Sequence, residues 1–167
     1  MPTVTRTTNV AVHTISFRGL AGAIFVCLAL ASILFVIGFA TTEWSVENGK
    51  HQGLWASCQC NADDHPDTDW FKATQAMITI GLIGLLLAMV LACIYLCIHS
   101  VSKNSTILAL VVVCFLACIF MIVGFSVYGS YQGGLSWSFV CAVISCILTF
   151  VAGVLAIFQI RDAGVRL

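Results

Sequence analysis

Four long apolar runs limit what this chain can fold into more than any other feature of its sequence. The runs contain no Asp, Glu, Lys, Arg or His, and they cover about residues 19–42, 73–98, 106–128 and 135–160. A helix needs about 20 residues to cross the ~30 Å hydrocarbon core of a bilayer, and each run is at least that long. Backbone polar groups in lipid must be satisfied within their own segment, which favours helices. We therefore predict an all-α membrane protein, a bundle of four transmembrane helices that forms one domain over residues 1–167.

The composition excludes several other classes of protein. Charged residues make up 8% of the chain, against roughly 25% in soluble domains. The seven basic and seven acidic residues balance, so the chain lacks the excess of positive charge that a nucleic-acid partner requires. The partner that this composition indicates is the lipid bilayer.

The distribution of positive charge predicts the orientation of the helices. Cytoplasmic segments are enriched in Lys and Arg. Five of the seven such residues lie before the first run, between the second and third, or after the fourth: Arg6, Arg18, Lys103, Arg161 and Arg166. Both termini are therefore expected in the cytosol, and residues 43–72 are expected to form an outer loop. The glycosylation sequon that begins at Asn104 would then face the cytosol and stay unmodified. A cleaved signal peptide is the alternative interpretation of the first run, which is long for one.

The apolar runs also argue against ion transport and catalysis. Proton-coupled transporters and ion pumps usually keep ionisable side chains inside their spans, and none is present here. The sequence offers no nucleophile with a base and an orienting group. We predict a protein that is not an enzyme, with no catalytic residue, no cofactor and no metal site.

Small residues and cysteines recur within the runs. Gly81, Gly84, Gly124 and Gly153 would let helices approach closely, either inside one bundle or at the face of a dimer. Cysteines within the runs are expected to act as small apolar residues. Cys97, near the cytosolic end of the second run, is also a candidate for S-palmitoylation.

The outer loop carries the most specific motif of the sequence. A Trp at the end of the first run precedes a Gly-Leu-Trp triplet, and two cysteines follow the triplet. The motif residues are Trp44, Gly53, Leu54, Trp55, Cys58 and Cys60. This combination, in the first outer loop of a four-span chain, resembles the signature of the claudin superfamily, which includes the peripheral myelin protein and epithelial membrane protein types of tetraspan. The chain is similar to a short, invertebrate-type claudin-like protein.

The resemblance implies a four-helix bundle with a small extracellular β-sheet from the first outer loop. Trp44 and the Gly-Leu-Trp triplet would pin the sheet to the bundle, and a disulfide between Cys58 and Cys60 would join two strands. Asn48-Gly49 is a turn signal for a hairpin in the same loop. Only Gln59 separates the two cysteines, so pairing between molecules and free thiols stay open as alternatives.

Two further segments are candidate binding surfaces. Asp63, Asp64, Asp67 and Asp69 form an acidic stretch of the outer loop, which is either a solvated turn or an outer surface that attracts cations. The chain ends in Val165-Arg166-Leu167, which is either a frayed tail or a ligand for a PDZ-type scaffold through Val165 and Leu167.

The family resemblance implies a function in adhesion. We expect a claudin-like protein of the plasma membrane at cell–cell contacts, of the tight-junction type, that acts in adhesion and in the paracellular barrier or its selectivity. Its partners would be like or related tetraspan chains in the same membrane and in the opposed one. The alternatives are an auxiliary or trafficking subunit of an ion channel or receptor, and a myelin-protein-like membrane organiser.

Overall fold

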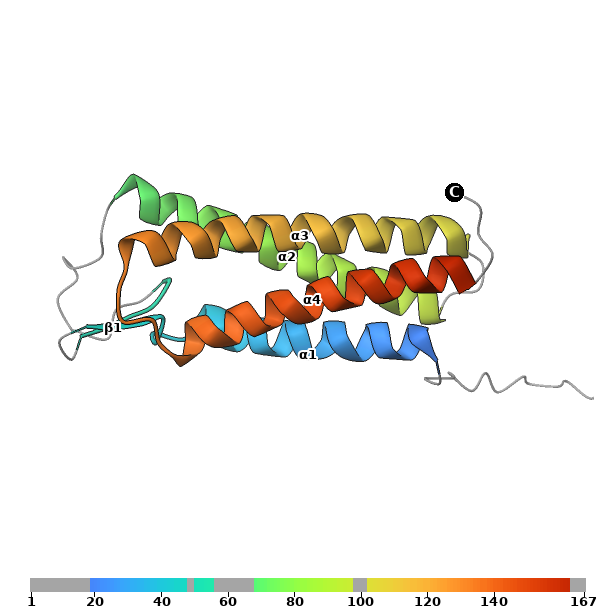
Figure 1. Ribbon diagram of the computed structural model, residues 1–167, viewed down its shortest axis with the longest axis horizontal. Coiled ribbons are helices and arrows are strands. Elements are labelled where there is room, and N and C mark those ends of the chain that lie inside the picture. The colour runs from blue at the N-terminus through green and yellow to red at the C-terminus, as the bar shows by residue number, and fades with distance from the viewer. Residues whose placement is uncertain (1–18, 48–49, 56–67, 98–101, 163–167) are drawn as a thin grey trace, which may run out of the picture.

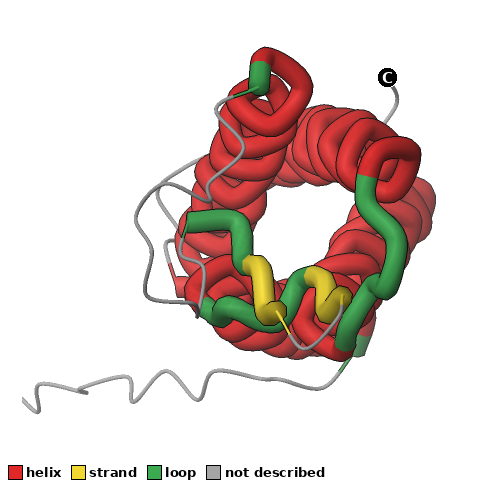
Figure 2. Tube along the Cα trace, turned by 90° about the vertical axis from the view of Figure 1, so that its left-hand side faces the viewer, coloured by secondary structure: helices red, strands yellow, loops and turns green. Residues whose placement is uncertain are grey.

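The structure of the protein is a computed structural model, which describes residues 19–47, 50–55, 68–97 and 102–162. These residues form four helices and a two-stranded sheet. The elements are α1 (Leu20–Ala40), β1 (Ser45–Glu47), β2 (Lys50–Gln52), α2 (Asp69–Cys97), α3 (Lys103–Tyr131) and α4 (Trp137–Asp162). The helices lie side by side along the long axis, and the sheet lies at one end of the bundle (Figure 1). Viewed from that end, the helices surround a common axis (Figure 2).

All four helices are long and apolar enough to cross a membrane. Their bounds differ from the apolar runs at several ends, most of all for α2 and α3. The helix α2 begins at Asp69, where the Thr68 carbonyl accepts hydrogen bonds from the amides of Phe71 and Lys72. An acidic first turn also suits the positive end of the helix dipole. Hydropathy alone does not predict that the helices include these polar first turns, because a helix can extend beyond its apolar stretch.

Small residues allow the helices to approach closely in pairs. The helix α2 packs mainly on α3, and α1 packs mainly on α4. A β-carbon at Gly124 would lie 2.6 Å from Cδ1 of Ile78, and one at Gly81 would lie 2.7 Å from Cγ of Met121. These glycines therefore serve packing inside the bundle, the first of the two interpretations that the sequence left open.

Buried hydroxyl groups hydrogen-bond to the helix backbone. Ser145 of α4 donates to the carbonyl of Ala31 in α1, over 2.8 Å between helices. Thr149 donates to the carbonyl of Ser145 one turn earlier in its own helix. Because an unsatisfied polar group is costly in an apolar core, these partners make the buried hydroxyls tolerable.

The outward faces of the helices carry large apolar side chains. Ile33, Ile83, Ile119 and Ile147, one from each helix, are all more than half exposed. Soluble monomers rarely expose contiguous apolar surface of this kind. These faces suit contact with lipid.

Candidate functional site

The sheet end of the bundle holds the described part of the sequence motif, and we call it the cap. The cap consists of β1, β2, residues 53–55 and the linker 132–136 between α3 and α4. The two strands are antiparallel, and Glu47 pairs with Lys50 across residues 48 and 49. Those two residues, the predicted turn, lie outside the described residues.

Trp44 joins the cap to the bundle. Its side chain is fully buried, and its indole nitrogen donates a hydrogen bond to the carbonyl oxygen of Gly38 near the end of α1. The last carbonyls of a helix lack helical amide partners, so this bond satisfies one of them. The indole also meets the rings of Tyr128 and Phe139 edge-on, with ring centroids 5.2 and 5.6 Å away. One residue therefore contacts three helices from the start of the hairpin.

The α3–α4 linker adds to the sheet beside β1. The amide of Val46 donates to the carbonyl of Gly134 over 2.9 Å, and the amide of Ser136 donates to the carbonyl of Trp44 over 2.9 Å. Ser45 forms a β-bridge with Leu135. Thus β1 lies between β2 and the linker, an arrangement that the local sequence pattern did not predict. The Gly133-Gly134 pair is the sequence feature from which a close approach of the linker to another backbone segment could have been predicted.

Gly134 permits this close approach. Its φ of +63° lies in the left-handed region, and a β-carbon there would clash with the carbonyl oxygen of Val46. A side chain at this position would therefore strain the backbone and also displace the linker from β1.

The three residues of the Gly-Leu-Trp triplet differ in their exposure. Gly53 and Leu54 are buried, and the carbonyl of Leu54 accepts a hydrogen bond of 2.7 Å from the side-chain amide of Gln75 in α2. Trp55 is 49% exposed, and its ring lies 5.5 Å from that of Phe39. The triplet thus fixes the chain to the bundle through Leu54 and presents Trp55 outward.

Polar contacts complete the cap. The Tyr128 hydroxyl donates to the hydroxyl of Ser45 over 3.2 Å, and the Gln132 side-chain amide donates to Oε1 of Gln52 over 2.9 Å. On the hairpin, Nδ1 of His51 lies 2.8 Å from Oε1 of Glu43. The first two contacts tie β1 to the end of α3 and β2 to the linker, whereas the third joins β2 to the segment between α1 and β1.

Exposed Tyr and Trp side chains lie at the cap end of the bundle, where Lys72 of α2 is exposed as well. Tyr131 and Trp137 are exposed at the cap end, where the ring of Trp70 stacks on Tyr131 at 4.8 Å. Lys103 and Arg161 are exposed at the other end, at the start of α3 and near the end of α4 (Figure 1). Aromatic rings favour membrane interfaces, and basic residues favour the cytosolic side.

Several predicted site residues lie outside the described residues. The disulfide, the acidic surface and the scaffold-binding tail therefore stay predictions. Two candidates are described: Asp69 is an exposed first residue of α2, and Cys97 is an exposed last residue of α2, at the end opposite the cap. The undescribed residues are Cys58, Cys60, Asp63, Asp64, Asp67, Val165 and Leu167.

A shallow apolar groove runs between α2 and α3, away from the cap. It has a volume of about 210 Å³, and Gly84 and Ala117 line it among larger residues. The walls carry Ile80, Ile83, Leu87, Val113, Leu116 and Phe120. Among the described residues, no group of three or more His, Cys, Asp or Glu side chains could hold a metal ion there or elsewhere.

Comparisons with known proteins do not assign the chain to a family. No protein-family model matches the sequence, and no curated protein matches it.

Proposed function

We propose that this chain is an integral membrane protein of the plasma membrane that acts in adhesion at cell–cell contacts, in the manner of a claudin-like tetraspan. Both termini would lie in the cytosol, and the cap would lie outside. The apolar helix faces support membrane insertion. The exposed rings of Tyr131 and Trp137 support a membrane interface at the cap end, and the five-to-two distribution of basic residues along the sequence supports this orientation.

The burial of Trp44 between the hairpin and the bundle carries the proposal. An adhesive surface must be held rigidly, because ordering flexible segments on contact costs free energy. Trp44 bonds to α1 and contacts α3 and α4 through its ring, so the hairpin that begins beside it is preorganised. Trp55 is the exposed aromatic side chain of this rigid cap, and Trp residues are enriched at the centres of protein interfaces.

Aggregation of cells that express the tagged chain tests the proposal. The host cells should have no adhesion of their own. We expect the chain to concentrate at cell–cell contacts and to aggregate the cells, and Trp55→Ala to reduce aggregation strongly, since removing a central Trp typically costs about 2 kcal/mol or more of binding.

Trp137→Ala is the matched control. Trp137 is 50% exposed at the same end of the bundle, but it belongs to α4 rather than to the hairpin. Aggregation should survive this change, with equal surface amounts of both variants. An evenly distributed wild-type chain that leaves cells apart would remove adhesion as the function.

The α2–α3 groove favours a second candidate function, as an auxiliary subunit of a channel or receptor. A lateral groove with a small-residue floor suits a helix of another membrane protein. Ile83, which is 61% exposed, lines the groove, and Ile119, which is 55% exposed, does not. For an auxiliary subunit, Ile83→Ala would reduce co-purification of a stoichiometric channel, and Ile119→Ala would not. The absence of any co-purifying channel would exclude this role.

A further inference from the structure

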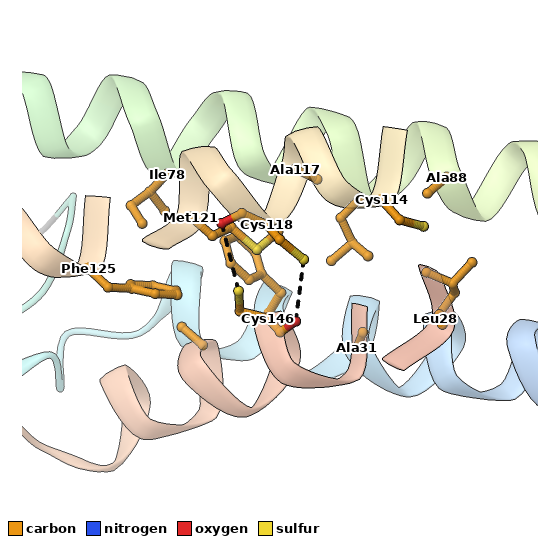
Figure 3. Packing of buried hydrophobic residues seen from close by; sticks show 14 of the residues in the cluster. Leu28, Ala31, Ile78, Ala88, Cys114, Ala117, Cys118, Met121, Phe125 and Cys146 are labelled. Carbon is orange, nitrogen blue, oxygen red and sulfur yellow. Dashed lines mark hydrogen bonds between the residues drawn. The ribbon is translucent and has the colours of Figure 1, made fainter. Parts of the chain in front are cut away.

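Three buried cysteines gather where α3 meets α4. Cys114 and Cys118 belong to successive turns of α3, and Cys146 belongs to α4 (Figure 3). Cys118 is 2% exposed and Cys146 is 6% exposed. The adhesive function proposed above uses none of these thiols.

Cys118 and Cys146 contact each other reciprocally. Sγ of Cys118 lies 3.6 Å from the carbonyl oxygen of Cys146, and Sγ of Cys146 lies 4.0 Å from the carbonyl oxygen of Cys118 (Figure 3). Two such contacts require the two residues to face each other directly across the helix crossing. Each sulfur is therefore held against the backbone of the residue that carries the other sulfur.

The two reciprocal contacts place the thiols of Cys118 and Cys146 side by side. The helices also approach closely about two turns further along α4, where a β-carbon at Gly153 would lie 3.2 Å from Cβ of Cys114. A disulfide needs β-carbons about 3.5–4.5 Å apart. Cys114 and Cys118 do not meet this requirement, because β-carbons four residues apart on a helix are about 5–6 Å apart. Among these three thiols the favoured pair is therefore Cys118 with Cys146.

We propose that Cys118 and Cys146 are a redox site that closes to an interhelical disulfide, with an organic hydroperoxide as the oxidant. One thiol sulfur attacks a peroxide oxygen, the O–O bond breaks, and the proton of that thiol passes to the leaving oxygen, so that an alcohol and a sulfenic acid form. The second sulfur then attacks the resulting sulfenic acid, the S–S bond forms, and the hydroxyl group leaves as water with the second proton. One hydroperoxide and two thiols thus give one disulfide, one alcohol and one water.

The surroundings of the pair select an apolar oxidant. Leu28, Ala31 and Met121 are buried in the same cluster, so an apolar reagent enters more readily than a charged one (Figure 3). The choice of a lipid-type hydroperoxide rests on the proposed membrane location, whereas the pairing rests on helix packing alone. The disulfide would join the two helices that hold the linker 132–136, and so would restrain the edge of the cap.

Differential thiol labelling of the full-length chain tests this proposal. The reduced protein, purified in detergent, is treated with cumene hydroperoxide, and a parallel sample is treated with diamide. Free thiols are then blocked by alkylation and sulfenic acids by dimedone under denaturing conditions. Disulfides are next reduced, the released thiols are labelled with a heavy reagent, and peptides are quantified by mass spectrometry. We expect heavy label at Cys118 and Cys146 together, about tenfold above that at Cys27 and Cys141, because a disulfide forms only where two thiols are held within reach of each other.

Cysteine variants separate a disulfide from independent oxidation. Cys118→Ser should leave Cys146 without heavy label, and Cys146→Ser should do the same for Cys118. Cys141→Ser is the control and should leave the labelling of Cys118 and Cys146 unchanged. Cys27 and Cys141 are less buried than Cys118 and Cys146, so oxidation that depended on exposure alone would label Cys27 and Cys141 first. Unlabelled Cys118 and Cys146 after both oxidants, or label at Cys146 that persists in Cys118→Ser, would overturn the proposal. Because the assay uses detergent-solubilised protein, its outcome is independent of cell adhesion.

Discussion

At the scale of single residues, Trp44 combines two roles that its sequence position alone suggests only in part. A Trp at the end of an apolar run is commonly an interfacial anchor. Here the side chain is instead fully buried, and its N–H group satisfies the Gly38 carbonyl at the end of α1. The ring provides apolar area, and the N–H group provides a bond that Phe would lack, so substitution can separate the two contributions.

Trp44→Phe should destabilise the protein while keeping most of the packed ring. The expected cost is about 0.5–1.5 kcal/mol, the net contribution of one hydrogen bond, because the Thr41 hydroxyl also donates to the Gly38 carbonyl over 3.3 Å and keeps it partnered. The measurement is the thermal unfolding midpoint of the detergent-solubilised chain. Trp137→Phe, at a half-exposed Trp of the same end, should change the midpoint little. Equal midpoints for the two variants would show that the Trp44 indole bond contributes no net stability.

Gly134→Ala should loosen the linker from β1. The positive φ alone costs about 1–2 kcal/mol for a residue with a side chain, and the clash with the Val46 carbonyl adds to this. Hydrogen exchange of the Val46 and Ser136 amides measures the effect, since both amides bond across this junction. Gly133→Ala is the control, because a β-carbon there has no neighbour within 4 Å. Unchanged exchange in Gly134→Ala would mean that the linker does not depend on this glycine.

At the scale of elements, the bundle is built from the pairs α2–α3 and α1–α4, which close glycine contacts bring together. Gly124→Ala should destabilise the α2–α3 pair by about 1–3 kcal/mol through overpacking, because its β-carbon would meet the buried side chain of Ile78. Gly129→Ala lies in the same helix with open space around it, and it should be neutral or slightly stabilising. Thermal unfolding of both variants gives the comparison. A Gly129→Ala variant as unstable as Gly124→Ala would refute the packing role of Gly124.

The local sequence pattern predicted the helices and the hairpin better than it predicted the contacts between them. The uninterrupted apolar runs indicated the four helices, and Asn48-Gly49 indicated the small hairpin beside Trp44. Leu135 was assigned to the fourth apolar run because it is hydrophobic, yet it pairs with Ser45 and α4 begins at Trp137. Its role depends on where β1 lies after folding, which a local hydropathy pattern does not contain. The bond from Gln75 to the Leu54 carbonyl is a tertiary contact of the same kind.

At the scale of the whole molecule, the ends of the bundle differ in chemistry. The cap end carries the exposed side chains of Tyr131 and Trp137 and also contains Lys50 and Lys72, whereas the other five basic residues of the sequence come before α1, at the start of α3, or at and after the end of α4. If the bundle crosses a membrane, the positive-inside preference orients it with the cap outside. The native sequon at Asn104 lies beside Lys103 in α3, and it therefore reports on the end opposite the cap.

Glycosylation mapping should distinguish the two orientations. Asn104 should stay unmodified in the wild-type chain, because the glycosylation machinery acts on the outer side. Asp63→Thr completes a second sequon at Asn61, in the loop between the hairpin and α2, and it should add one glycan. Endoglycosidase treatment and gel mobility measure both sites, and Asn104→Gln in the Asp63→Thr background should leave the glycan in place. A glycan on the wild-type chain that Asn104→Gln removes would invert the orientation, place the cap in the cytosol and exclude the cap as an adhesive surface.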